Sequence, residues 1–437
     1  MRTVRFSAVV LTLVVASGCG RSGDQPPRAG EIASEAATSQ SNPPASSTPQ
    51  NDLAAALGVG RSLPIPEGLV PGGDCPPPPP DADQEIAAQA KAAVPLTEGL
   101  TFAYAWTRTP REEYECLIQV KKIDALGIVT TASCDAPEGR GPFLRRVCRA
   151  DLRSSRMLHT VYGAVKVIGA SGEEEPETIT GATAFSLSSD AFAQLKRTGA
   201  FTHRYVEVES SDKLAKDGVG ELRIEGRETM KLILNDRVVD VPVINTRGTM
   251  KWWIRGERLE TEDTAVILDD DRFPLLIDQK DSNEKTGSRI RFAKITYPST
   301  GRRESGGGSL AMRGGSLEDG LVDNKRVDVY GIYFDFNSDR IRAESEPVLE
   351  EIGGIMKRYP DWRLSVQGHT DNIGGNGQYN LELSQRRSAA VVSALVNRFG
   401  ISASRLTSGG SGAASPKDTN DTSEGRARNR RVELVRQ

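Results

Sequence analysis

Histidine is scarce in this chain, and the cysteines form no metal-binding pairs. The three histidines, His159, His203 and His369, stand far apart, and no CxxC pair occurs among the 437 residues. Zinc sites are usually built from closely spaced cysteine and histidine ligands, so we expect no bound metal. Because no nucleophile stands beside His369, we expect that side chain to pack and hydrogen-bond rather than to act as a catalytic base.

Long apolar runs and an excess of charge are lacking as well. After the N-terminus no apolar run approaches the ~18 residues of a membrane-spanning helix, so we expect no such helix there. The formal net charge of −3 is close to neutral for this length, which argues against general nucleic-acid binding. Hydrophobic residues make up 37% of the chain, enough for the cores of two or three domains.

Residues 1–18 have the pattern of a secretory signal peptide. Two arginines precede an apolar stretch of about a dozen residues, which is too short to remain as a transmembrane helix. The tetrad ASGC, ending at Cys19, resembles the lipobox of bacterial lipoproteins, in which the cysteine becomes the lipid-modified first residue. Ala16 stands where leucine is usual, so the alternative is ordinary cleavage without a lipid, or no processing at this position. Gly20, in place of aspartate, favours the outer membrane over the inner one.

Four further cysteines can form two disulfides in an oxidising compartment. They are Cys75, Cys116, Cys134 and Cys148. Three connectivities are open to them, and the sequence does not choose between these. The last three lie close together in the sequence, so a pair among them is favoured.

Residues 19–93 are rich in proline, serine, alanine and glycine, and include a run of five consecutive prolines. This composition predicts a disordered tether. A flexible segment of about 70 residues has a relaxed span of roughly 45 Å, which would let the folded part stand clear of a membrane. A linker without any mechanical role is the alternative.

Residues 94–299 predict a mainly antiparallel β domain, because short alternating segments are separated by turn signals. Apolar residues alternate at 230–234 and 239–243 around Asn235-Asp236, which suits a two-residue hairpin turn. One helix is expected at 190–197, capped by Ser188 or Ser189 and ended by Gly199. Further strands are expected at 100–106, 114–120, 157–167, 250–254 and 289–297.

The sequence does not reveal what this β domain does. One alternative is a ligand-binding or enzymatic domain that the rest of the chain merely localises. Another is a component of an envelope assembly that contacts its partners through the β domain.

Residues 300–324 are rich in glycine and serine and predict a second linker. Residues 325–437 then alternate strands with helices, which predicts an α+β sandwich of the βαβαβ type. The strands are expected at 330–336, 364–366, 405–408 and 431–435, and the helices at 345–359 and 379–399.

Two opposite charges stand out in the segment GHTDNIGGNGQYNLELSQRR, which runs from Gly368 to Arg387. Asp371 follows a predicted strand, and Arg387 lies in the helix after it. A carboxylate can accept from an ammonium group, and arginine grips a carboxylate with a rigid bidentate fork. The pair therefore suits a zwitterion, such as the free amino-acid end of a peptide side chain.

Four motifs occur in order: FDFNS, GHTDNIG, YNLELSQRR and PKDTNDTSEGRARNRRVEL. Together they resemble the OmpA-like peptidoglycan-binding domain that outer-membrane protein A shares with the peptidoglycan-associated lipoprotein. The resemblance covers about a quarter of the chain, and it implies binding of diaminopimelate in the stem peptides of Gram-negative peptidoglycan. The loop from Asp371 to Tyr379 is one residue longer than expected for the family, and Ser388 stands where alanine is usual. Neither departure removes a charge.

Carried over residue by residue, the resemblance assigns the ammonium of diaminopimelate to Asp371 and its carboxylate to Arg387. Residues spaced by three, four or seven positions share a helical face, so the helix can present its part of the site together. The expected lining residues are Thr370, Asn380 and Leu383, with the turn at Phe336 and Asn337 as the other wall. Arg428, Arg430 and Arg431 are expected to be a solvated or fold-supporting edge.

These expectations combine into one prediction. The chain would be a Gram-negative outer-membrane lipoprotein that faces the periplasm and tethers the outer membrane to the cell wall without covalent attachment. It would have no enzymatic activity and no cofactor. Its expected partners are peptidoglycan, the outer membrane through a lipid at Cys19, and further envelope proteins, but no nucleic acid.

Overall fold

The structure is a computed structural model that describes most of the chain after residue 62. The described residues are 63–109, 112–134, 142–159, 167–168, 174–254, 257–282, 289–298, 317–335, 337–373 and 375–437. The signal peptide and Cys19 lie outside this range, as does Phe336. The described residues all belong to one compact unit, which contains two main sheets. Among the described residues, no helix combines the length and the apolar character needed to cross a membrane.

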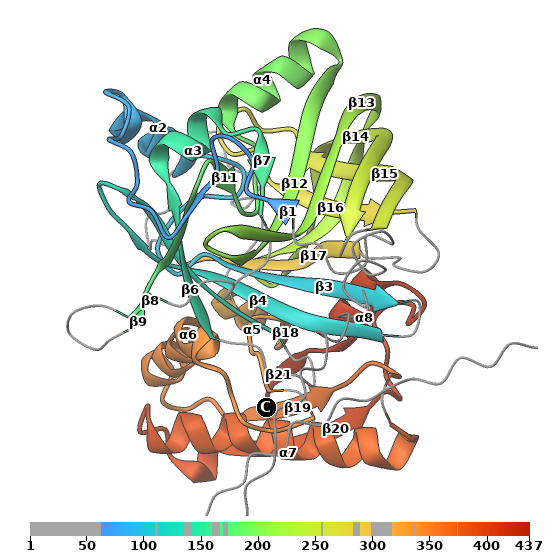
Figure 1. The fold of residues 1–437 in the computed structure, drawn as a ribbon. Helices are drawn as coiled ribbons and strands as arrows, with labels where there is room; N and C mark the ends of the chain where they lie inside the picture. Colours follow the sequence, from blue (N-terminus) through green and yellow to red (C-terminus); the bar gives the residue numbers. More distant parts are fainter. Residues whose placement is uncertain are drawn as a thin grey trace, which may run out of the picture. The chain divides into compact units, whose positions relative to one another are not determined.

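The larger sheet is mainly antiparallel and is formed by residues 63–296 (Figure 1). Its strands follow the order β11-β7-β12-β13-β14-β15-β16-β17-β3-β4-β5-β6-β10-β2, with β1 paired to β13 and a separate small hairpin of β8 and β9. The strand bounds are β1 Leu63–Pro64, β2 Val70–Pro71, β3 Thr101–Thr109, β4 Glu112–Ile123, β5 Gly127–Cys134, β6 Phe143–Cys148, β7 Met157–Leu158, β8 Val167–Ile168, β9 Glu174–Glu175, β10 Glu177–Thr180, β11 Ala182–Thr183, β12 Ala200–Ser210, β13 Lys213–Leu234, β14 Arg237–Ile254, β15 Glu257–Leu268, β16 Leu276–Asp281 and β17 Arg289–Thr296.

The hairpin predicted around Asn235-Asp236 is present, and its strands β13 and β14 are far longer than the alternating segments suggested. Both turn residues have positive φ, 43° and 64°, as a two-residue turn that matches the strand twist requires. Local turn chemistry therefore predicted the centre of the hairpin but not its extent.

The main core of this region contains stacked aromatic rings, with Phe102 and Phe292 at a centroid distance of 5.0 Å.

Three helices accompany the larger sheet: α2 (Ala82–Gln89), α3 (Arg149–Ser154) and α4 (Ser189–Thr198). The predicted caps of α4 are confirmed. Ser188 Oγ accepts from Ala191 N at 3.2 Å, and Gly199 ends the helix with φ 76°. Glycine has no Cβ and adopts the left-handed backbone conformation at little energetic cost, which is why glycine commonly ends helices.

The strand predicted at 157–167 was wrong in its extent. Only Met157–Leu158 forms β7, and residues 160–166 lie outside the described range. At His159 the backbone N–H still donates to Thr183 O at 2.9 Å, while the carbonyl accepts from the buried guanidinium of Arg145.

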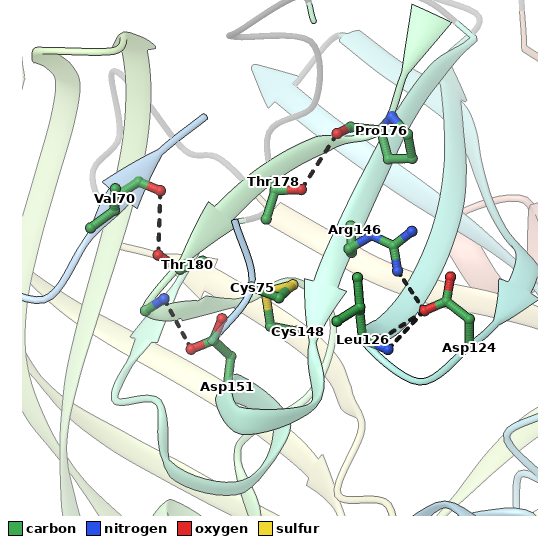
Figure 2. The surroundings of a disulfide bond; sticks show 12 residues. Val70, Cys75, Asp124, Leu126, Arg146, Cys148, Asp151, Pro176, Thr178 and Thr180 are labelled. Carbon is green, nitrogen blue, oxygen red and sulfur yellow. Dashed lines mark hydrogen bonds and ion pairs between the residues drawn. A yellow bond between two sulfur atoms is a disulfide. The ribbon is translucent and has the colours of Figure 1, made fainter. Parts of the chain in front are cut away.

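The predicted tether over 19–93 also extends too far. Within its last third, β1 pairs with β13 and β2 pairs with β10. A disulfide joins Cys75 to Cys148 at the end of β6, as Figure 2 shows. Arg153 of α3 pairs with Asp81, directly before α2, and with Glu85 in α2. Composition did not indicate these anchors, because a covalent bridge and ion pairs hold the segment with few large apolar side chains.

The four cysteines thus form two bridges, Cys75–Cys148 and Cys116–Cys134. The second lies within the sequence cluster that the analysis favoured, and it joins opposite positions of the neighbouring strands β4 and β5.

The smaller sheet has the order β18-β21-β19-β20, with β19 and β20 parallel and the other neighbours antiparallel. The helix α7 packs against β19 and β20, and α6 packs beside α7. The bounds are α5 Leu317–Asp323, β18 Arg326–Val329, the short 3-10 helix η2 Ala343–Ser345, α6 Glu346–Arg358, β19 Leu364–His369, α7 Gly377–Asn397, the 3-10 helix η3 Ala403–Arg405, β20 Leu406–Gly412, α8 Ser423–Asn429 and β21 Val432–Arg436.

Most predicted elements of this region are present with ends shifted by a few residues, and two differences are larger. The expected linker 300–324 includes α5, whose Leu317 and Leu321 are buried in the core of the smaller sheet. The first strand runs over 326–329 instead of 330–336. It ends there because the backbone N–H groups of Tyr330 and Gly331 donate to the Asp236 carboxylate instead of to a neighbouring strand.

Replacing both Cys75 and Cys148 by alanine should lower the free energy of unfolding by about 4 kcal/mol, because the bridge closes a loop with a sequence separation of 73. The same change at Cys116 and Cys134, with a separation of 18, should cost about 3 kcal/mol. Urea unfolding of the oxidised protein and of both variants shows which variant loses more free energy of unfolding. A smaller loss for the Cys75 and Cys148 variant would contradict this account.

Candidate functional site

Asp371 lies just beyond the end of the central strand β19. The chain is held there because Thr370 N donates to Gly412 O at 3.0 Å. The Asp371 side chain is 10% exposed, and both of its oxygens have partners. Oδ1 accepts from Ile373 N at 3.0 Å, and Oδ2 accepts from Arg430 Nη1 at 2.6 Å. The first contact forms a local turn typical of aspartate, while the second neutralises the charge.

The start of α7 is fixed against the same loop. Asn376 caps the helix by accepting from Tyr379 N at 2.8 Å, and Asn380 Nδ2 donates to Asp371 O at 3.3 Å. Leu383, one turn further along, is buried. The helical face that the spacing predicted therefore lies beside the loop that carries Asp371.

Arg387, a further turn along α7, contacts the turn that the sequence analysis placed on the opposite wall. Its Nε donates to Ser338 O at 2.9 Å, and its guanidinium carbon lies 4.9 Å from the centroid of the Phe334 ring. Such a cation over an aromatic face is an attractive contact. Asn337, beside this contact, is exposed and has φ 55°.

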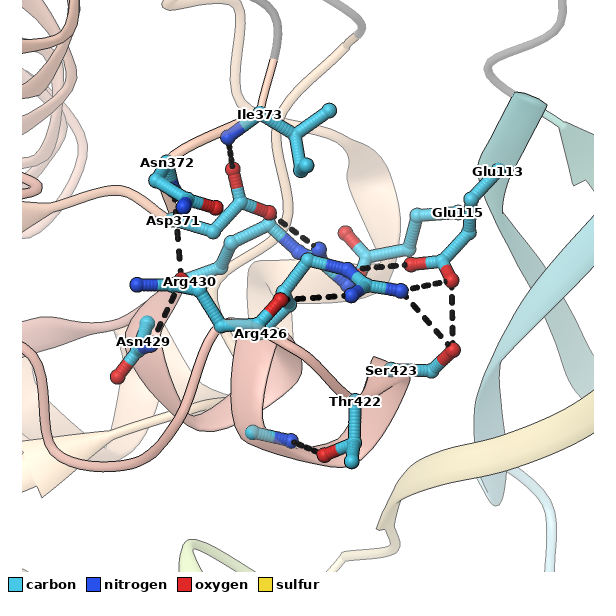
Figure 3. A network of polar contacts seen from close by, with 12 residues as sticks. Glu113, Glu115, Asp371, Asn372, Ile373, Thr422, Ser423, Arg426, Asn429 and Arg430 are labelled. Atoms are coloured by element: carbon cyan, nitrogen blue, oxygen red, sulfur yellow. Dashed lines mark hydrogen bonds and ion pairs between the residues drawn. The ribbon is translucent and has the colours of Figure 1, made fainter. Parts of the chain in front are cut away.

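Arg430 is the residue that sequence reasoning missed. Its two arginine neighbours fit the expected fold-supporting edge: Arg428 pairs with Asp418, and Arg431 Nε donates to Asp328 Oδ1 at 2.8 Å. Arg430 instead contacts the carboxylate of Asp371, the group expected to bind the ligand ammonium (Figure 3). The strand order explains the contact, because Gly368 of β19 pairs with Val432 of β21 and so brings the residues just before β21 close to residue 371. The sequence alone carries no signal for this pairing.

A small polar network fixes the loop before α8 against this corner. Asn429 is 1% exposed, and its side chain makes four hydrogen bonds, to Lys417 N, Asp418 N, Asp418 O and Asn420 Oδ1. Asn420 Oδ1 in turn accepts from Asn372 N at 3.3 Å. The position of the Asp371 loop therefore depends on a side chain more than fifty residues further along the chain.

His369 is a buried packing residue at the end of β19. Burial lowers its pKa from the usual 6.5, and the nearby Arg431 lowers the pKa further, so the ring is neutral at pH 7. Its Nε2 lies 3.5 Å from Glu433 Oε2. Within the part of the chain that the structure describes, no group of three or more His, Cys, Asp or Glu side chains could hold a metal ion.

The comparisons with known proteins concern this region of the chain. Residues 333–430 match the OmpA family. Outer membrane porin F of Pseudomonas aeruginosa is 40% identical over 102 residues, which is 23% of this chain and 29% of the porin. Peptidoglycan-binding protein ArfA of Mycobacterium bovis is 40% identical over 88 residues, 20% of this chain and 26% of that protein. The chain thus spans less than a third of these relatives.

Among solved structures, the peptidoglycan-associated lipoprotein from Burkholderia pseudomallei is similar to this chain. The two are 31% identical, the match covers 24% of this chain and 88% of the lipoprotein, and the TM-score is 0.23. The family match and the porin relative identify residues 333–430 as an OmpA family domain, which we call the OmpA domain below.

Asn429→Ala should lower the free energy of unfolding by about 2 kcal/mol, because it removes a buried amide whose oxygen accepts from the backbone N–H groups of Lys417 and Asp418. Asn397→Ala is the matched control, since Asn397 is exposed and bonds only to Ser393 among the described contacts. Denaturant unfolding of the two variants gives the comparison. Equal losses for both would show that the Asn429 network does not support the corner.

Proposed function

We propose that the OmpA domain binds peptidoglycan without covalent attachment and holds the diaminopimelate of an uncrosslinked stem peptide. The observation that carries this proposal is the OmpA family match over residues 333–430, which contains both Asp371 and Arg387. Similarity to a peptidoglycan-binding protein over 88 residues supports it.

Recognition depends on two charges on adjoining segments. Asp371 accepts from the ligand ammonium, and Arg387 donates to the extra carboxylate of diaminopimelate. The loop that carries Asp371 is hydrogen-bonded to α7 through Asn380, and α7 also carries Arg387, so one rigid helix relates the two charges. A stem peptide with lysine in place of diaminopimelate lacks that carboxylate and would leave the guanidinium without its partner, so it should be discriminated against.

The remaining residues of the site have supporting roles in this proposal. Thr370 and Leu383 line the floor of the site, and both are buried. Asn380 orients the Asp371 loop, and Asn337 forms the opposite wall together with Ser338, whose carbonyl accepts from Arg387. Phe336, which was expected in this wall, lies outside the described residues. Each charge-assisted contact contributes on the order of 1.5 to 3 kcal/mol, so a single domain binds reversibly. Firm attachment of a membrane to the wall then requires many copies acting together.

The proposed cellular role follows from the two ends of the chain. A lipid on Cys19 would hold the N-terminus in the outer membrane, and the OmpA domain would hold the other end to the cell wall. The protein would thus be a periplasm-facing outer-membrane lipoprotein. Similarity to an outer membrane porin and to a peptidoglycan-associated lipoprotein supports an envelope location.

Co-sedimentation with purified sacculi tests the site. Asp371→Ala and Arg387→Ala should each weaken binding at least ~tenfold, because each removes one charge-assisted contact. Arg386→Ala and Asp361→Ala are the matched controls, since both residues are exposed and the first is the immediate neighbour of Arg387 on α7. Free diaminopimelate should compete and free lysine should not. If both site variants sediment like the controls, the assignment of the two charges is wrong.

Metabolic labelling with a radioactive fatty acid tests the anchor. In a Gram-negative host the wild-type chain should take up the label and fractionate with outer membranes, whereas Cys19→Ala should lose the label and appear in the periplasmic extract. Binding of the extracted variant to sacculi should be unchanged, because the OmpA domain is not altered. Label retained by the variant would place the modification on another residue.

A further inference from the structure

The β domain presents two carboxylates to the OmpA domain at the start of β4. Glu113 and Glu115 lie two residues apart and therefore point to the same face of the strand. Glu113 accepts from Arg426 Nε at 3.1 Å and from Ser423 Oγ at 2.6 Å. Glu115 Oε1 lies 3.3 Å from Arg430 Nη2. Figure 3 shows both carboxylates reaching the side chains of α8 and the residue after it.

Further contacts surround this pair of carboxylates. Lys294 of β17 is 2% exposed, donates to Arg430 O at 3.2 Å and lies 3.4 Å from Glu115 Oε1. Arg291 of the same strand pairs with Glu424 of α8. Buried charges are costly unless they are paired, and here each charge has an opposite neighbour. The contact between the β domain and the OmpA domain is therefore a specific, charge-paired interface.

Arg430 is shared between this interface and the proposed ligand site. Its Nη1 donates to Asp371 Oδ2 at 2.6 Å, while its Nη2 faces Glu115 at 3.3 Å. The contact with Asp371 is the shorter of the two, and both carboxylates stabilise the charged guanidinium. Its Nε is buried and has no hydrogen-bond partner in the described part of the chain, so the five N–H donors of this side chain are not all used.

Glu115 is a permanent anion. Burial alone would raise the pKa of its carboxyl, but the charges of Arg430, Lys294 and Arg342 outweigh that effect and hold the pKa at about 2. Glu115 therefore accepts from a guanidinium at any physiological pH.

A ligand ammonium that approaches Asp371 meets a carboxylate that already holds an internal cation. It can take the place of Arg430 only if the displaced guanidinium keeps an anionic partner, because an unpaired buried charge is strongly unfavourable. Glu115 is that partner, already within contact distance. Turning fully to Glu115 would also allow a two-bond fork through Nε and Nη2, which would satisfy the unused donor.

We propose that Glu115 of the β domain is a positioning residue for peptidoglycan binding: it receives Arg430 when a ligand ammonium displaces that guanidinium from Asp371. The inference rests on the function proposed above. The β domain thereby favours ligand binding by the OmpA domain, and by linkage a bound ligand strengthens the contact between the two domains.

Calorimetric titration of the full chain with a diaminopimelate-containing muropeptide tests the proposal. Glu115→Gln should weaken binding about fivefold, the lower end of typical coupling between sites. Glu115→Asp should recover most of the affinity, because it restores the anion. Glu228→Gln is the matched control, since Glu228 is an exposed glutamate on β13.

A double-mutant cycle separates the proposed route from a general structural effect. In an Arg430→Gln background, Glu115→Gln should have no further effect on affinity, because no guanidinium needs to be received. Thermal unfolding of each variant establishes that it is folded. If Arg430→Gln does not fold, the comparison of Glu115→Gln with Glu115→Asp decides the question.

The outcomes distinguish this inference from the proposed function. Wild-type affinity in Glu115→Gln, together with lost binding in Asp371→Ala, would overturn the role of Glu115 and leave the ligand site standing. An equal loss of affinity in Glu115→Gln and Glu115→Asp would also overturn the role of Glu115. Wild-type affinity in both Asp371→Ala and Arg387→Ala would instead overturn the proposed function itself.

Discussion

One guanidinium links the two sheets of the described chain. Arg430 lies between Asp371, at the end of β19, and Glu115, on β4. The side chains of all three are largely removed from water, with exposed fractions of 20%, 10% and 20% for Arg430, Asp371 and Glu115. Removing Arg430 would leave both carboxylates without their shared cation, which is costly for charges this far from water. The geometry of the ligand loop and the docking of the β domain are therefore not independent of each other.

The strand order explains why Arg430 can occupy this position. β21 lies between β18 and β19, so the chain that enters β21 passes the end of β19. Asn429, just before Arg430, fixes the preceding loop through four hydrogen bonds of its side chain. A backbone held this firmly leaves little freedom at the neighbouring residue, and movement at Arg430 is confined to its long side chain. This suits a group that must turn between two carboxylates without shifting the sheet.

Features set by neighbouring residues could be predicted from the sequence, and features set by distant ones could not. The turn at Asn235-Asp236 and the caps of α4 depend on local backbone preferences. The OmpA domain could be predicted because its motifs are ordered along the chain. Arg430 was misjudged because its second partner, Glu115, is 315 residues away. The end of the tether was misplaced for the same reason, since the bridge at Cys75 spans 73 residues.

The covalent bridge between Cys75 and Cys148 decides where a mechanical load would enter the fold. If the N-terminus is held in a membrane and the OmpA domain in the wall, tension would run along the chain, cross the two-residue strands β1 and β2, and then reach the bridge at Cys75. There it would pass into β6, an interior strand of the larger sheet. Extension of the envelope would thus pull on a cross-linked sheet rather than peel α2 and its neighbouring segment away from it.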